Sequence, residues 1–126
     1  MVEVVMCIAY CEDEIVIVRR AQREGKLLWQ FPGGGIENNE TIFDTAIREL
    51  KEETNLNGEV VEVIGTRIHP YTKKEIAYVA MKVNKDEIII NDPDLDLGMF
   101  VKINEITNYF TTPLFNKVIE YLNKLN

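Results

Sequence analysis

The sequence has few of the residues that build thiolate metal sites or disulfide frameworks. Its 126 residues include two cysteines and one histidine, and no further Cys or His lies near Cys7 and Cys11 at the spacing of a zinc site. We therefore interpret both thiols as reduced and structural. No apolar run reaches the roughly 18 residues of a membrane span, and the first residues lack the features of a signal peptide. These absences predict a cytoplasmic protein with no membrane partner.

Positive charge is also scarce, because 14 Lys and Arg residues face 21 Asp and Glu residues, for a formal net charge of -7. This balance argues against long nucleic acids as partners. A small anionic substrate would need local arginines or a divalent cation to offset the protein's own field. The chain is 46% hydrophobic and shows no repeat, low-complexity tract or linker, so we predict one domain over residues 1–126.

Several β-branched runs separated by polar turns predict a sheet. The expected strands cover residues 2–10, 15–20, 58–69, 75–83 and 97–103. An apolar run at residues 27–31 stops at Pro32, and the three glycines from Gly33 to Gly35 then predict a flexible loop or a close backbone turn. A closing amphipathic helix is predicted to begin at Pro113, with Thr112 as its N-cap.

A helix is predicted over residues 42–54. Thr41 and Asp44 have the spacing of a capping box, and Asn55 stands where a left-handed residue is needed after the helix. The residues expected to form its buried stripe recur at helical spacing: Phe43, Ala46, Ile47, Leu50 and Thr54.

Glu49 lies about one helical turn before Glu52 and Glu53. We place these three glutamates on an arc beside and opposite the stripe, pointing away from the core. Like charges at that spacing cost roughly 0.2–0.5 kcal/mol per pair unless a cation lies among them. Arg48 is expected to lie to one side and to pair with Glu40. Carboxylates without thiol or imidazole favour Mg²⁺, with Mn²⁺ as a second choice. On spacing alone, a solvated helix face or an interaction surface without metal stays open.

Other residues are candidates for contacts to a substrate. Arginines near the end of the second strand are either a solvated edge or donors to phosphate: Arg19, Arg20 and Arg23. Aromatic residues that could stack on a base, with core packing as the alternative, are Trp29, Tyr78 and Phe100. His69 is more often packed or solvated than catalytic in such a position, although it could hydrogen-bond a substrate.

An acidic segment follows residue 90, where Asp92, Asp94 and Asp96 alternate. The glycine and the final glutamate of an EF-hand loop are missing, so we exclude an EF-hand. The segment is expected to be a solvated loop, with a contributed metal-binding carboxylate as the alternative.

The central stretch resembles the Nudix box of the Nudix hydrolases. Gly34, Glu40 and the segment RELKEETNL at residues 48–56 match its fixed positions, except that Asn55 stands where the family has glycine. Because asparagine tolerates the left-handed conformation, we expect the turn to be kept. The segment from Trp29 to Pro32 also resembles the family's approach to the box.

The resemblance implies an α/β fold of the Nudix type, an α/β/α sandwich with a mixed β-sheet between helices. It places metal and catalytic roles on the Gly33 carbonyl, Glu49, Glu52 and Glu53. Among these, Glu49 would be a ligand or the base that activates water. Gly34, Glu40 and Arg48 would hold the loop against the helix. A carboxylate from a later loop often completes such a site, and Asp94, or else Asp96, is our candidate.

The resemblance also implies hydrolysis of a nucleoside diphosphate linked to another group X. We expect a Mg²⁺-dependent, MutT-like pyrophosphohydrolase that acts on a small nucleotide and cleaves a nucleoside triphosphate to monophosphate and pyrophosphate. The alternative substrates are a dinucleoside polyphosphate, ADP-ribose or a nucleotide sugar, because the box contacts the diphosphate and the base pocket lies elsewhere. A non-catalytic nucleotide-sensing domain is the alternative of another class. Family members are often dimers, so a homodimer stays open.

Overall fold

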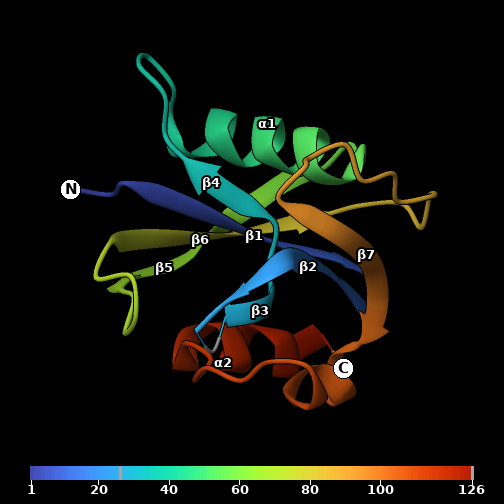
Figure 1. Ribbon diagram of the computed structural model, residues 1–126. Helices are drawn as coiled ribbons and strands as arrows, with labels where there is room; N and C mark the ends of the chain where they lie inside the picture. Colours follow the sequence, from blue (N-terminus) through green and yellow to red (C-terminus); the bar gives the residue numbers. More distant parts are fainter. Residues whose placement is uncertain (26, 126) are drawn as a thin grey trace.

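The computed structural model describes residues 1–25 and 27–125, which form a seven-stranded sheet with a helix on each face (Figure 1). The strands are β1 Val4–Cys11, β2 Glu14–Glu24, β3 Leu27–Gln30, β4 Gly33–Gly35, β5 Glu59–Ile68, β6 Glu75–Lys82 and β7 Leu95–Lys102. The helices are α1 Ile42–Thr54 and α2 Asn116–Leu125, and a 3₁₀ segment, η1 Ile103–Asn108, precedes α2. None of the helices formed by the described residues is long and apolar enough to cross a membrane.

Strand β1 organises the sheet because it pairs along both edges. One edge pairs in parallel with β6, where Val4 lies opposite Ile76. The other edge pairs antiparallel with β4 near its start, where Met6 lies opposite Gly33, and with β2 near its end. The order across the sheet is β3-β2-β1-β6-β5, and β7 pairs with β2. The sheet is therefore mixed, and β4 lies directly beside the central strand.

The side chains of β1 alternate between the two faces of the sheet. Toward α1 they form a buried cluster that includes Val5, Cys7, Ala9, Ala46 and Leu50. Toward α2 the buried cluster includes Ile8, Ile15, Ile17, Val118 and Leu122. Each helix thus covers one face, and Figure 1 shows α1 and α2 on opposite sides of the sheet.

The predicted ends of α1 are confirmed. The Thr41 hydroxyl accepts a hydrogen bond from the Asp44 N–H at 3.0 Å, and the Asp44 carboxylate accepts one from the Thr41 N–H at 3.1 Å. Asn55 has φ 65° and is left-handed. These local interactions start and stop the helix at the residues that the sequence indicates.

The predicted buried stripe of α1 is wrong in part. Phe43 and Ile47 are 42% and 45% exposed, whereas Glu53, which we placed facing away from the core, is only 6% exposed. The reason is that β4 packs against the flank of α1 that carries Glu53, so this flank is covered and the opposite one is not.

Two further expectations differ from the structure. The three glycines form strand β4, because their backbone groups pair with the free edge of β1. Helix α2 begins at Asn116 and not at Pro113. The Pro113 carbonyl accepts a hydrogen bond from Arg67, and the Phe115 ring packs on Tyr78, so residues 113–115 follow the sheet before the helix starts.

Candidate active site

Strand β4 and helix α1 lie in direct contact at two glycines. The Gly33 N–H donates a hydrogen bond to Glu53 Oε1 at 3.0 Å. A Cβ atom at Gly33 would collide with the Val5 carbonyl oxygen, and one at Gly34 would lie 2.5 Å from the carboxylate carbon of Glu49. The absence of a side chain lets Gly33 pair closely with β1 and lets Gly34 approach Glu49.

Arg48 connects β4, the following loop and the acidic side of α1. Its Nε and Nη2 donate to the two carboxylate oxygens of Glu40 at 2.6 and 2.9 Å, which is a bidentate pair. The same guanidinium donates to the Gly35 carbonyl at 3.0 Å, to Glu49 at 2.8 Å and to Glu52 at 3.2 Å. Hydrogen bonds from Arg48 lower the pKa of Glu40 to about 2. The loop is thereby held against the helix.

The position of Arg48 corrects our expectation that it lies to one side of the glutamates. Its Nη1 contacts both Glu49 and Glu52, so part of the repulsion among the three carboxylates is offset by a cation of the chain itself. None of the ion pairs among residues 1–25 and 27–125 includes Glu53. Among the three glutamates, Glu53 is therefore the one that has no basic partner within the described residues.

Burial makes the carboxylates of Glu53 and Glu49 costly to ionise. It raises the pKa of Glu53 to about 8, although the hydrogen bond from Gly33 acts in the opposite direction. Burial also raises the pKa of Glu49, against the effect of Arg48. A second positive charge beside these two groups would relieve this cost.

The chemistry of the nearby donors fits a hard divalent cation, because all of them are oxygens: the carboxylates of Glu49, Glu52 and Glu53 and the Gly33 carbonyl. Within the part of the chain that the structure describes, however, no three His, Cys, Asp or Glu residues form a group that could hold a metal ion. The Glu52 side chain is 56% exposed and is turned toward Arg48. An exposed side chain can change rotamer without a change in the backbone, so Glu52 has the freedom to join the buried pair.

The three aspartates of the acidic loop lie in different surroundings. The charge of Asp92 contributes to the raised pKa of both buried glutamates. Asp96 instead pairs with Arg19 at 2.8 Å, and exposed Asp94 borders a separate cavity with residues 20–24. Asp92 is therefore a further candidate for the carboxylate from this loop, and the contribution of Asp94 or Asp96 stays a prediction.

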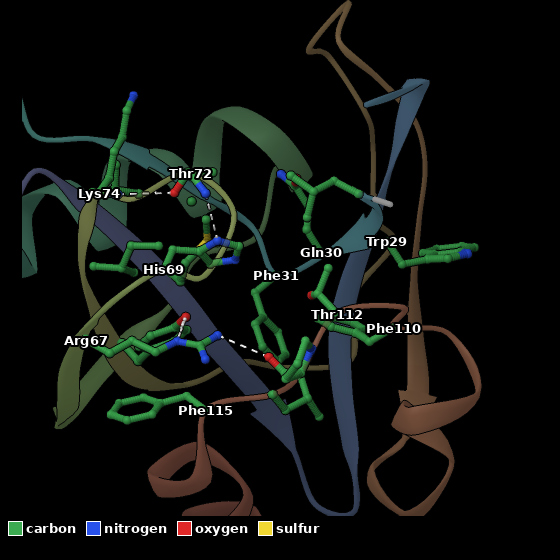
Figure 2. Close-up of a pocket in the computed structure, with 18 of the residues that line it drawn as sticks. Trp29, Gln30, Phe31, Arg67, His69, Thr72, Lys74, Phe110, Thr112 and Phe115 are labelled. Carbon is green, nitrogen blue, oxygen red and sulfur yellow. Dashed lines mark hydrogen bonds between the residues drawn. The ribbon is translucent and has the colours of Figure 1, made fainter. Parts of the chain in front are cut away.

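A cavity of about 230 Å³ lies beside Gly33 and Gly34, on the face of the sheet that α2 covers (Figure 2). Its aromatic walls include Phe31, Tyr78, Phe110 and Phe115. Its polar lining includes Gln30, Arg67, His69 and Thr112. The two glycines thus border both the cavity and the buried glutamates.

The structure separates the predicted substrate contacts into two groups. Those that line this cavity are Arg20, Trp29, Tyr78 and His69. Arg19 lies over the Trp29 ring, 5.6 Å from its centroid, and is held by Asp96. Arg23 donates to the Gly25 carbonyl, and Phe100 packs in the core below α1.

Sequence reasoning missed Arg67, Gln30 and several aromatic residues of the cavity. One signal was available, because Arg67 and His69 are two residues apart in a predicted strand and so share a face. Phe110 and Phe115 gave no such signal, since they reach the cavity only through the path of the segment between η1 and α2.

Comparison with known proteins gives matches across the chain. The model of the NUDIX domain matches residues 2–121. An RNA pyrophosphohydrolase from Campylobacter jejuni is 29% identical over 131 residues, covering 87% of this chain and 81% of that protein. An RNA pyrophosphohydrolase from Thioalkalivibrio sulfidiphilus is 56% identical over 45 residues, but this match spans 36% of the chain and only 26% of the relative's length.

The fold also matches a solved structure. The crystal structure of a NUDIX hydrolase from Nitrosomonas europaea has a TM-score of 0.80, with 22% sequence identity, over 98% of this chain and 72% of that one. This likeness confirms the predicted α/β/α sandwich with a mixed sheet. Together with the domain match over almost all residues, it confirms the family that the box resembles. The chain belongs to the Nudix hydrolase family.

Proposed function

We propose that this protein hydrolyses a phosphoanhydride bond in a nucleoside diphosphate linked to X, with Mg²⁺ as cofactor. The preferred substrate is a nucleoside triphosphate, which is cleaved to monophosphate and pyrophosphate. One observation carries the proposal: Gly33 and Gly34 border both the aromatic cavity and the buried glutamates. A nucleotide with its base in the cavity would extend its phosphates toward this acidic cluster.

The residues that would hold the cation are the Gly33 carbonyl, Glu52, Glu53 and Asp92. When bound, the cation supplies positive charge that offsets the phosphate oxygens and lowers the pKa of water. We assign the proton acceptor to Glu49, because its carboxylate faces Gly34 at the border of the cavity and Arg48 holds it in place. The strand β4 fixes Glu53 through the Gly33 N–H.

The experiment that tests the activity is a product screen with Mg²⁺ or Mn²⁺. The substrates are the four common nucleoside triphosphates, ADP-ribose, a nucleotide sugar and a dinucleoside polyphosphate, and the products are separated by ion-exchange chromatography. We expect pyrophosphate and monophosphate from the triphosphates. Faster cleavage of ADP-ribose would move the assignment to that alternative, and no product from any substrate would favour a nucleotide-sensing domain.

Glu49→Gln tests the assigned base. Loss of a general base typically costs about 10²–10⁴-fold in rate, so we expect kcat to fall by that order while nucleotide binding is retained. Glu62→Gln is the matched control. Glu62 is exposed on β5, so this substitution removes the same charge at a position away from the site. Equal activity of the Glu49→Gln and Glu62→Gln variants would overturn the assignment.

A second candidate substrate is the triphosphate at the 5′ end of RNA, which the names of the two pyrophosphohydrolase relatives favour. Our expectation of no long nucleic-acid partner rests on the net charge of -7. An assay in which a 5′-triphosphorylated RNA competes with a free nucleoside triphosphate distinguishes the two candidate substrates. A higher kcat/KM for the RNA that falls with added salt would favour RNA, because contacts to its backbone phosphates release counterions.

A further inference from the structure

The hydrogen bonds of His69, at the wall of the cavity, determine which of its ring nitrogens carries the proton. Its Nδ1 accepts hydrogen bonds from the backbone N–H groups of Tyr71 at 3.2 Å and Thr72 at 3.3 Å, in the turn that follows β5. A ring nitrogen that accepts carries no proton, so the proton of the neutral imidazole lies on Nε2. Figure 2 shows this edge of the His69 ring directed toward the cavity.

The neutral form of His69 is also favoured by its surroundings. Burial lowers the pKa of His69, and the positive charges of Arg67 and Arg20 lower it further. A protonated ring would also direct an Nδ1–H group at the two backbone N–H donors of the turn. His69 therefore offers the cavity one hydrogen-bond donor and no acceptor.

Arg67 adds further donors to the same wall. Its Nε donates to the Tyr78 hydroxyl at 3.0 Å and its Nη2 donates to the Pro113 carbonyl at 3.3 Å. The guanidinium carbon lies 5.6 Å from the Tyr78 ring centroid and 5.3 Å from that of Phe115. A guanidinium has donors only, and these contacts hold its plane in place (Figure 2).

The size and the walls of the cavity favour a flat ring. Its volume of about 230 Å³ is below the roughly 300 Å³ at which pockets for drug-sized ligands begin. It therefore fits a single base better than a whole nucleotide. Phe31 and Phe110 have ring centroids 4.8 Å apart and form an apolar wall. A base bound there would present its polar edge to His69 and Arg67.

We propose that His69 and Arg67 select nucleotides whose base carries a carbonyl oxygen at the position where a competing base carries an amino group. This inference rests on the proposed function and names the substrate class within it. A 6-oxopurine is then preferred over adenine, and uracil over cytosine. The carbonyl oxygen has two lone pairs and can accept from both donors. An amino group is itself a donor, and the ring nitrogen beside it has one lone pair, so one of the two donors stays unpaired, which costs about 10- to 100-fold in kcat/KM.

The test compares ITP with ATP and UTP with CTP, because within each pair the bases differ at the exocyclic group and the adjacent ring nitrogen. In the wild type, we expect each kcat/KM ratio to favour the oxo base by about 10- to 100-fold. His69→Ala should reduce both ratios toward one by lowering the values for ITP and UTP most. His69→Gln, whose amide keeps an N–H donor, should restore part of the preference.

Lys73→Asn is the matched control. Lys73 lies in the same turn with φ 63°, a conformation that asparagine tolerates, and its side chain is outside the cavity lining. The variant loses one positive charge beside the pocket and should keep the wild-type ratios. An equal loss of preference in Lys73→Asn would show that general charge, and not His69, sets the selectivity.

Wild-type ratios near one, or an equal loss on ITP and ATP in His69→Ala, would overturn the proposal. Calorimetric binding of IMP and AMP without metal measures base selection separately from hydrolysis. A tenfold preference for IMP in a protein that cleaves no nucleotide would refute the proposed function and retain this inference. A protein that hydrolyses nucleotides but binds IMP and AMP equally would refute this inference and retain the proposed function.

Discussion

The packing of strand β4 against helix α1 leaves no space for a side chain at Gly34. Its missing Cβ would lie 2.5 Å from the Glu49 carboxylate, whereas a Cβ at Gly35 would meet nothing closer than the Glu3 carbonyl at 3.9 Å. The two glycines are neighbours with different functions. Gly34 sets the position of a carboxylate, and Gly35 contributes its carbonyl to Arg48.

This difference predicts the effect of adding one methyl group. Gly34→Ala should displace Glu49 and lower kcat/KM by at least about tenfold, because small displacements of a reacting group are costly. Gly35→Ala should stay within about twofold of the wild type, since an alanine keeps the carbonyl and meets open space. Steady-state kinetics on one triphosphate measures both. Similar rates for the two variants would show that Glu49 is not held by this contact.

At the scale of the element, α1 is fixed by its caps, and the caps set which residues face β4. The capping box at Thr41 and the left-handed Asn55 define 13 helical residues. The Arg48–Glu40 pair then fastens the preceding loop to the second half of the helix. A change at a cap should therefore alter stability without changing the chemistry of the glutamates.

Thr41→Ala removes the side-chain acceptor for the Asp44 N–H. We expect a loss of about 1 kcal/mol in the free energy of unfolding, measured by urea denaturation at 25 °C. Thr41→Ser keeps the hydroxyl and should be about as stable as the wild type, because serine is at least as good an N-cap as threonine. An alanine variant as stable as the serine variant would contradict the role of this cap.

At the scale of the whole molecule, the burial of Glu53 links stability to the charge of the site. The cores on the two faces of the sheet hold β1 and α1 in place. In this packing Glu53 is only 6% exposed. The fold therefore carries a cost that a bound cation would remove. The expected homodimer stays a prediction.

The pH dependence of the metal-free protein tests this cost. The pKa of Glu53 is raised from 4.5 to about 8 by folding, so between these values the folded state binds more protons than the unfolded state. Stability that this group contributes should therefore fall as pH rises from about 5 to 8. Glu53→Gln should remove that part of the slope. The measurement is the difference in urea midpoint between wild type and variant, in EDTA, at pH 5 and pH 8.

Added Mg²⁺ should stabilise the wild type more at pH 8 than at pH 5, because the deprotonated carboxylate is the form that binds a cation. The glutamine variant should show little of this effect. Parallel pH profiles of the wild type and the variant in EDTA would contradict a raised pKa of Glu53 in the folded protein.

Much of this protein is determined locally by its sequence. The ends of α1 follow from Thr41, Asp44 and Asn55, because capping interactions join residues at most a few positions apart. The positions of the box, from Gly34 to Leu56, are likewise readable in order along the chain. The pattern of apolar runs predicts the strands, and the mixed sheet is implied by the family that the box resembles.

The tertiary structure alone decided which carboxylates are buried and what faces them. Glu53 is covered because Gly33, 20 residues away, pairs with β1. Arg67 is held at the cavity wall by a hydrogen bond to the carbonyl of Pro113, 46 residues away. The charge of Asp92, which comes from a distant loop, acts on the buried Glu53. Periodicity shows which residues share a face of one element. Burial depends on which other element covers that face, and that is fixed only when distant segments pack together.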